Sequence, residues 1–368
     1  MASRFSTAFF VSLIGAGVFA GCSSTPSTDA PTEVPRYDEI VLFEVTDTYP
    51  IFRIPSLIET PTGAILAFAE GRESLYDDGD IDLVMRRSDD DGATWGPIEV
   101  IIDAGADTAG NPTPVVDETT GRIWLPYCTN PAADGRNLRR MWITYSDDDG
   151  VSWAEPRELT DALRQDDWGW VSLGPGRGIQ LASGRLLIPA NHSSGDNIRQ
   201  AHTVYSDDHG ETWQLGGDLG AGTDESQLVE LSDGRVMMNS RYVGEEHFRA
   251  ISYSEDEGTT WSDITLDENL PEPICQGSIL NTVHGLVFTN PATQEEFPRD
   301  RMTVRISQDE GQSWPSERLL DRGPSAYSAT AVLSDGRIAV LWESGDLHPY
   351  EKLKFAAFNV AWVNEAAP

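Results

Sequence analysis

The sequence predicts an all-β protein and, more narrowly, a six-bladed β-propeller with Asp-box repeats. Three observations support this prediction. Two different motifs recur along the chain at intervals of roughly 50 residues, which is typical of repeat architectures. Short apolar runs bounded by turn residues outnumber helical patterns across the 368 residues. Such runs indicate short β-strands joined by tight turns.

The first motif is Ser-x-Asp-x-Gly-x-(Thr/Ser)-Trp, which we call the Asp-box. Its residue types favour a turn, because Ser and Asp side chains bond to nearby backbone groups and Gly adopts a positive φ without strain. The Trp is suited to packing the turn onto a sheet. The motif occurs five times, beginning at Ser88, Ser146, Ser206, Ser254 and Ser307.

The second motif is a glycine followed by a short apolar run. The first five copies each precede an Asp-box, which places both motifs in one repeating unit. In the sixth unit we expect the sheet to close without an Asp-box, at residues 353–363. Six units of this kind predict a propeller that spans residues 37–364. The copies begin at Gly63, Gly121, Gly184, Gly234, Gly285 and Gly336.

A calcium loop is the alternative interpretation of the Asp-box. An EF-hand loop requires an oxygen ligand five residues before its Gly. In the first Asp-box that position is Arg87, a cation, and in the others it is Tyr145, Tyr205, Tyr253 and Ile306. We therefore reject calcium there. The six His show no metal-binding spacing, so we expect neither a metal nor another cofactor.

The net charge of −34 and the pI of about 4.3 argue against a nucleic-acid partner. A phosphate backbone requires a basic face on the protein that binds it. We interpret the acidity as a solvated surface.

The N-terminal segment predicts targeting. Arg4 precedes an apolar run that is too short to span a bilayer as a helix. The run ends in VFAGC, which resembles a bacterial lipobox with Cys22 as the lipidated residue. We therefore expect residues 1–21 to be a lipoprotein signal peptide and residues 22–36 a disordered tether. The alternative is an ordinary secretory signal cut near Gly21.

These features predict a monomer that is either a lipoprotein of the cell envelope, in the outer membrane or periplasm, or secreted. It would touch a membrane only through the lipid anchor.

Cys128 and Cys275 remain once Cys22 is assigned. They could form a disulfide or be two buried free thiols, and the sequence does not decide between these states.

An arginine inside an apolar run is the first indication of a ligand site. Arg53 lies in the sequence Phe-Arg-Ile-Pro. Burying its charge without a partner would cost several kcal/mol. We expect both a carboxylate of the protein and an anionic ligand to serve as partners.

The sequences FRIP (Phe52–Pro55) and AEGR (Ala69–Arg72), together with the five Asp-boxes, resemble the bacterial exo-α-sialidases (neuraminidases) of glycoside hydrolase family 33. The similarity covers nearly all of residues 37–363. The Asp-box alone is unspecific, whereas FRIP followed by AEGR is specific. The resemblance implies a retaining exo-α-sialidase that hydrolyses terminal sialic acids of glycoproteins, glycolipids or oligosaccharides and needs no cofactor.

The resemblance also implies three arginines that bind the substrate carboxylate. These are Arg53, Arg241 and Arg299, with Arg301 as the alternative to the third. Several bidentate arginines would fix the orientation of a carboxylate. The family pattern makes Glu343 the acid that braces Arg53. We expect Arg72 to face the site near the substrate carboxylate or the catalytic acid.

By the same resemblance, Tyr327 is the nucleophile. Most retaining glycosidases use a carboxylate, and sialidases are an exception. The anomeric carbon of sialic acid bears a carboxylate, which would repel an anionic nucleophile. A phenol needs a base, and Glu225 matches the family's base, with Asp224 as its neighbour. The acid/base is Asp77, with Asp78 as the alternative.

Two other functions stay open at this point. The first is hydrolysis of a related ulosonic acid with a different C5 substituent, whose pocket could lie near Gly169–Trp170 or Asn191–His192. The second is a sialoglycan-binding propeller without catalysis. The linkage preference, and hydrolysis as opposed to transfer, are also left open.

Overall fold

The computed structural model describes residues 33–131 and 138–365. The predicted signal peptide, Cys22 and most of the predicted tether lie outside the described residues. Residues Val34–Pro368 form one unit. Within the described part of the chain, no helix is both long enough and apolar enough to cross a membrane.

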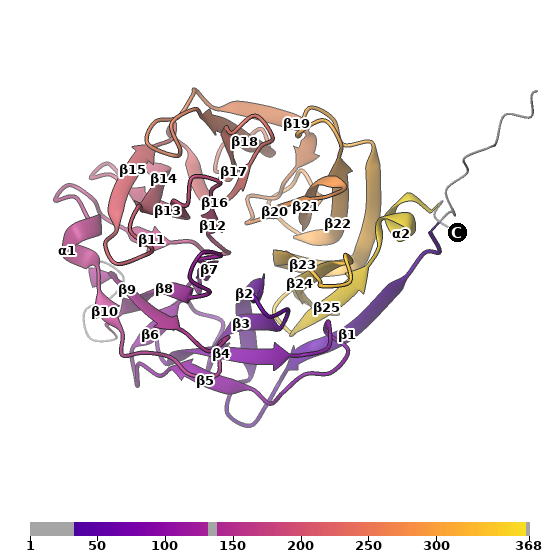
Figure 1. Ribbon diagram of the computed structural model, residues 1–368, viewed down its shortest axis with the longest axis horizontal. Coiled ribbons are helices and arrows are strands. Elements are labelled where there is room, and N and C mark those ends of the chain that lie inside the picture. Colours follow the sequence, from indigo (N-terminus) through magenta and orange to yellow (C-terminus); the bar gives the residue numbers. More distant parts are fainter. Residues whose placement is uncertain (1–32, 132–137, 366–368) are drawn as a thin grey trace, which may run out of the picture. The chain divides into compact units, whose positions relative to one another are not determined.

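The strands form four hydrogen-bonded sheets, which we divide into the six blades that the repeats predict, arranged around a centre (Figure 1). The pairing is antiparallel except for one parallel contact between blades one and two. Blade one contains β2 (Ile51–Glu59), β3 (Ile65–Arg72), β4 (Ile81–Ser88) and β5 (Glu99–Ile102). Blade two contains β6 (Thr108–Gly110), β7 (Val115–Val116), β8 (Ile123–Asn130), β9 (Arg140–Ser146) and β10 (Arg157–Glu158). Blade three contains β11 (Val171–Leu173), β12 (Ile179–Gln180), β13 (Leu186–Ser193), β14 (Arg199–Ser206) and β15 (Gln214–Asp218).

The other three blades follow the same order. Blade four contains β16 (Thr223–Glu230), β17 (Val236–Tyr242), β18 (Phe248–Ser254) and β19 (Thr265–Pro271). Blade five contains β20 (Ser278–Thr282), β21 (Gly285–Pro291), β22 (Asp300–Ser307) and the first part of β23 (Ser316–Val332). Blade six contains the rest of β23, β24 (Ile338–Ser344), β25 (Lys352–Phe358) and β1 (Tyr37–Glu44). Two short helices are α1 (Thr160–Leu163) and α2 (Val360–Asn364).

Blade six closes the ring with both ends of the described chain. Its outer strand is β1, which pairs antiparallel with β25. The sequence predicts that residues 353–363 close this blade without an Asp-box, and it does not predict the contribution of β1. In the structure that segment supplies β25 and then α2, where Trp362 stacks on Tyr37 with ring centroids 4.4 Å apart. The pairing of β1 with β25 therefore joins the two ends of the propeller.

The five Asp-boxes have the same internal hydrogen bonds. In the second box the Gly150 amide donates to Ser146 Oγ at 2.8 Å, and the Ser152 amide donates to Asp148 Oδ1 at 2.8 Å. Gly150 has a φ of +81°, as the turn requires. The turn's own donors therefore occupy the carboxylate, which agrees with the rejection of a calcium loop.

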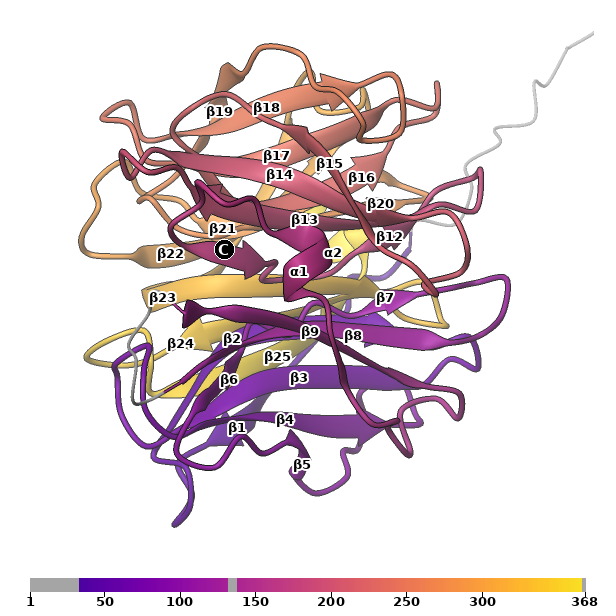
Figure 2. The same ribbon diagram turned by 90° about the vertical axis from the view of Figure 1, so that its left-hand side faces the viewer.

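The innermost strands of several blades carry irregularities at one end. β2 pairs irregularly with β3 between Arg53 and Ser56, and β16 with β17 between Thr223 and Ser226. The pairing of β23 with β24 is likewise irregular between Ser325 and Ser328. Such bulges turn a side chain away from its regular direction. Figure 1 shows β2, β16 and β23 around the centre, and Figure 2 gives the side view.

Candidate active site

Arg53 has the protein partner that its apolar surroundings require. Its Nε donates to Glu343 Oε1 at 3.0 Å, and both side chains are buried. The backbone amide of Ile54, at a φ of +54°, donates to the same oxygen at 2.9 Å. The irregular backbone of the FRIP sequence therefore directs two donors toward one carboxylate.

Glu343 also holds the segment that carries Tyr327. Its Oε2 accepts a hydrogen bond from the Tyr327 amide at 3.1 Å. The side chain of Glu343 has no exposed area. One buried carboxylate in β24 thus fixes both Arg53 in blade one and the backbone of Tyr327 in blade six.

Tyr327, Glu225 and Arg241 form a compact cluster. The Tyr327 hydroxyl lies 2.6 Å from each carboxylate oxygen of Glu225. Arg241 Nη1 donates to Glu225 Oε2 at 2.7 Å and to the Tyr327 hydroxyl at 3.2 Å. Glu225 and Arg241 lie on the paired strands β16 and β17, as their 16-residue separation predicts.

The Tyr327 phenol is held in its neutral form. Burial raises its pKa well above 10, Glu225 raises it further, and Arg241 acts in the opposite direction. Ionisation of this phenol therefore requires that its proton pass to a base, and Glu225 is within hydrogen-bond distance to accept it.

Arg299 lies near this cluster as a mostly buried cation. Its Nη2 donates to the Ile274 carbonyl at 2.7 Å, and it interacts electrostatically with Tyr327 and Arg241. No carboxylate of the described residues forms an ion pair with it. Arg301 is exposed and lines a pocket on the outer side of blade five. Of the two alternatives, the structure brings Arg299 to the cluster.

Asp77 lies at the edge of the site, in the loop after β3. Its Oδ1 accepts from Arg72 Nη1 at 2.9 Å and from Arg53 Nη1 at 3.4 Å, while half of its side chain is exposed. The Asp78 side chain is exposed as well, but these contacts with the arginines belong to Asp77. Arg72 also donates through Nε to buried Glu70 at 2.8 Å. Arg72 therefore holds the loop that carries Asp77.

Tyr350 is a residue of the site that was not predicted from the sequence. The guanidinium of Arg53 lies over the Tyr350 ring, with Cζ 4.0 Å from its centroid. A cation stacked on an aromatic face loses conformational freedom and gains electrostatic stabilisation. Tyr350 lies in a loop between β24 and β25, where no repeat or apolar pattern marks it.

Cys128 and Cys275 are both buried free thiols, which settles the question that the sequence left open. Burial raises the pKa of Cys275 to about 11, so this thiol is protonated at neutral pH although it lies near the arginines. Cys275 therefore does not have the lowered pKa of a reactive cysteine.

The regions considered for a C5 pocket are occupied by packing. His192 stacks on Trp168 with ring centroids 3.9 Å apart. The Trp170 ring lies against Arg139, at 4.3 Å, and Asn191 donates to the Gly174 carbonyl. The contacts of His192 and Asn191 do not reach the three candidate arginines in the described residues.

Among the residues that the structure describes, one group of side chains could hold a metal ion. His192, His202 and Asp218 each offer a ligand atom, and these atoms lie within 4.8 Å of one another. The two Nδ1 atoms lie 3.1 Å apart, which is also the distance of a hydrogen bond between neutral imidazoles. This group is separate from the Tyr327 cluster, and we assign no reaction step to it.

The histidine pair predicts a pH-dependent stability. Burial lowers the pKa of His192 to about 4 and that of His202 well below 6.5. The unfolded chain therefore binds more protons between about pH 6.5 and 4, and stability falls as pH falls. We expect the stability advantage of the wild type over His202→Gln to shrink by up to about 1.4 kcal/mol per pH unit in this range.

Urea unfolding at several pH values measures this difference. The matched control is His284→Gln, at an exposed position, whose difference from the wild type should not depend on pH. A pH-independent difference for His202→Gln would show that the pair is already protonated or does not titrate.

Fold and cluster together define a β-propeller that brings arginines, carboxylates and a buried tyrosine together at one place. A model of the BNR repeat-like domain family matches residues 63–340. The sialidase of Micromonospora viridifaciens is 34% identical over 346 residues, which are 86% of this chain and 52% of that protein. The exo-alpha-sialidase of Aspergillus fumigatus is 31% identical over 390 residues, covering 91% of this chain and 93% of that protein.

Solved structures agree with these relatives. The Hadza microbial sialidase Hz136 matches with a TM-score of 0.77 and 30% identity, over 84% of this chain and 66% of that chain. A Trypanosoma rangeli sialidase with 2,3-difluorosialic acid, a covalent intermediate, shares the fold at a TM-score of 0.74 and 20% identity, over 87% of this chain and 58% of that chain. The chain belongs to the sialidase family, as its resemblance to glycoside hydrolase family 33 implied.

Proposed function

We propose that this protein is a retaining exo-α-sialidase that uses Tyr327 as its nucleophile. The contact of the Tyr327 hydroxyl with both oxygens of Glu225 carries the proposal. A neutral phenol that is buried against a carboxylate, beside cations, fits attack on an anomeric carbon that itself bears a carboxylate. Catalytic pairs of nucleophile and base have this geometry.

The substrate carboxylate would bind to Arg53, Arg241 and Arg299. Arg299 is the strongest indication of an anionic ligand, because a mostly buried cation without a carboxylate partner is costly. Glu343 and Glu225 hold Arg53 and Arg241 in place, so both guanidinium groups are oriented before the substrate arrives. Such preorganisation reduces the entropy that binding costs.

The chemistry then follows from the positions of three side chains. Glu225 takes the phenolic proton as Tyr327 Oη bonds to the anomeric carbon, and the bond to the glycosidic oxygen breaks. Asp77 protonates that oxygen as it leaves. Asp77 next takes a proton from water, which attacks the anomeric carbon and releases Tyr327, and Tyr327 recovers its proton from Glu225. Two displacements at one carbon retain its configuration.

We assign the acid/base role to Asp77 and expect Asp77→Asn to lower kcat/KM on a natural sialoside by about 10²- to 10⁴-fold. The loss should be smaller on a 4-methylumbelliferyl sialoside, because that leaving group needs little protonation. The measurement is steady-state kinetics on both substrates.

Asp78→Asn is the matched control, since it removes one charge from the same loop. It should keep kcat/KM within about twofold, as exposed substitutions do. The assignment fails if Asp78→Asn shows the larger loss, or if the loss in Asp77→Asn does not depend on the leaving group.

Release of free sialic acid from a sialylated glycoprotein tests the function as a whole. A non-catalytic sialoglycan-binding protein would bind the glycoprotein and release nothing. A hydrolase of a related ulosonic acid would act on the deaminated sugar and leave the N-acetylated one intact.

For the location of the protein we propose a lipid anchor on Cys22. The test is detergent-phase partitioning: the wild type should be retained in the detergent phase, and Cys22→Ser should not.

A further inference from the structure

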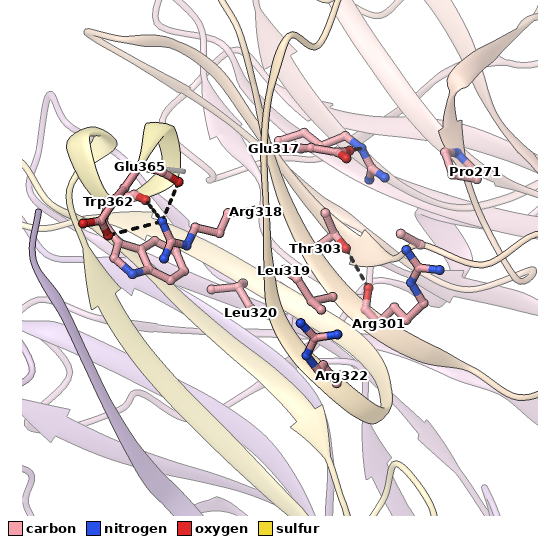
Figure 3. A pocket seen from close by; sticks show the side chains of 12 residues that line it. Pro271, Arg301, Thr303, Glu317, Arg318, Leu319, Leu320, Arg322, Trp362 and Glu365 are labelled. Atoms are coloured by element: carbon pink, nitrogen blue, oxygen red, sulfur yellow. Dashed lines mark hydrogen bonds and ion pairs between the residues drawn. The ribbon is translucent and has the colours of Figure 1, made fainter. Parts of the chain in front are cut away.

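Four arginines and two glutamates line a cavity that lies outside the Tyr327 cluster. This pocket has a volume of about 550 Å³ and lies at the outer edge of blade five, between β22, β23 and α2 (Figure 3). The chain has 26 basic and 60 acidic residues. Four arginines at one pocket are therefore more than its acidic composition would lead one to expect. The arginines of this pocket, which we call the rim pocket, are Arg301, Arg305, Arg318 and Arg322.

Two of these arginines are fixed by the protein. Arg305 is 5% exposed, contacts Glu317 through Nε at 3.3 Å and donates to Asn290 Oδ1 at 3.2 Å. Arg318 stacks on Trp362 and donates to the Glu365 carbonyl at 2.9 Å. Arg318 also forms an ion pair with the Glu365 carboxylate at 3.5 Å, so Glu317 and Glu365, which line the rim pocket as well, offset the charges of these two arginines.

The other two, Arg301 and Arg322, are exposed, and no carboxylate of the described residues forms an ion pair with either. Arg301 has a φ of +63°, a conformation that a side chain makes unfavourable. Burial lowers the pKa of Arg305, Glu317 acts in the opposite direction, and the nearby charge of Arg301 lowers it further. The fold therefore brings like charges together, which an anion between them would stabilise.

The shape of the rim pocket suits an acidic sugar. Its volume is within the range of small-molecule sites. Leu319 and Leu320 give it apolar walls, and Figure 3 shows Arg301, Arg318 and Arg322 around them. An arginine fork binds a carboxylate bidentately, and apolar walls suit the ring of a sugar.

We propose that the rim pocket binds the carboxylate of a second sialic acid on the glycan whose terminal sialic acid occupies the active site. This inference rests on the proposed function. Arg299 and Arg301 are two residues apart, at the start of β22, yet Arg299 interacts with Tyr327 while Arg301 lines the rim pocket. One short segment thus connects both carboxylate-binding places, so a branched glycan could occupy both.

A glycan with two sialic acids should bind more tightly than a glycan with one, because it can occupy both places at once. Once one sialic acid is bound in the active site, the second binds at a high effective concentration. A glycan with two terminal sialic acids should therefore have a lower KM than one with a single sialic acid, beyond the statistical factor of two.

The experiment compares the wild type with the double variant Arg301→Gln/Arg322→Gln. The substrates are a biantennary glycan with one or two terminal sialic acids of the same linkage, and a 4-methylumbelliferyl sialoside. The control is Arg140→Gln/Arg235→Gln, which removes two positive charges of ion pairs elsewhere on the surface. Thermal unfolding checks the fold, and the two single variants replace the double variant if it is unstable.

We expect the double variant to lose about fivefold or more in kcat/KM on the disialylated glycan, through KM, and less than twofold on both monosialylated substrates. The control should change less than twofold on all three. Equal changes on the mono- and disialylated glycans, or an effect of the same size in the control, would overturn the proposal. Absence of wild-type turnover on the small sialoside would instead refute the proposed function, and this inference with it.

Discussion

Tyr327→Phe is expected to lower kcat on a 4-methylumbelliferyl sialoside by about 10³-fold or more. The change removes one oxygen, the atom that lies 2.6 Å from both carboxylate oxygens of Glu225. Glu225 keeps its ion pair with Arg241, so no buried charge loses its partner. The fold and substrate binding should therefore survive, and the loss should appear in kcat.

Tyr350→Phe is the matched control for this experiment. It removes the same atom from the other tyrosine that touches Arg53 but keeps the ring, whose centroid lies 4.0 Å from the guanidinium. We expect turnover within about threefold of the wild type, because stacking on a cation needs only the ring. Equal losses in both variants would assign the effect to packing around Arg53 instead of to a nucleophile.

Glu343→Gln is expected to destabilise the protein by about 3–5 kcal/mol, since it leaves the buried charge of Arg53 without its main partner. Glu343 accepts hydrogen bonds from Arg53, from the Ile54 amide and from the Tyr327 amide. The glutamine side chain has only one acceptor oxygen, so it cannot accept all three hydrogen bonds. Its NH₂ group would also face the N–H donors of these residues. Turnover should fall as well, because Arg53 and Tyr327 both lose a support.

Urea unfolding and steady-state kinetics test this prediction together. Glu211→Gln is the control, because Glu211 is exposed and pairs with Arg122 at 3.4 Å on the surface. It should cost at most about 1 kcal/mol. A similarly small cost in Glu343→Gln would mean that Arg53 finds compensation elsewhere, for example from Asp77.

The sequence predicted those parts of the site in which a residue has a local reason for its place. Arg53 in an apolar strand needs a carboxylate, and Glu343 is that partner. Glu225 and Arg241 are separated by the length of a hairpin, and they meet across β16 and β17. The repeats predicted six blades because each unit begins with the same glycine followed by an apolar run.

Other parts depend on contacts that no local pattern reveals. The pairing of β1 with β25 joins residues that are more than 300 positions apart. Tyr350 reaches Arg53 from a loop without periodicity. The choice between Arg299 and Arg301 depends on the backbone, because Arg301 adopts a φ of +63° and lines the rim pocket. Sequence spacing alone could not separate these two arginines.

A covalent bond between substrate and Tyr327 is the central claim of this account. Incubation with 2,3-difluorosialic acid should trap it, because fluorine beside the anomeric carbon destabilises the oxocarbenium-like transition state of the second step. We predict a protein mass increased by one 2,3-difluorosialic acid less one HF, because the anomeric fluoride leaves and the phenol loses its proton, with the adduct on the peptide that contains Tyr327. An adduct on Glu225 or Asp77, or turnover that continues in Tyr327→Phe, would contradict the account.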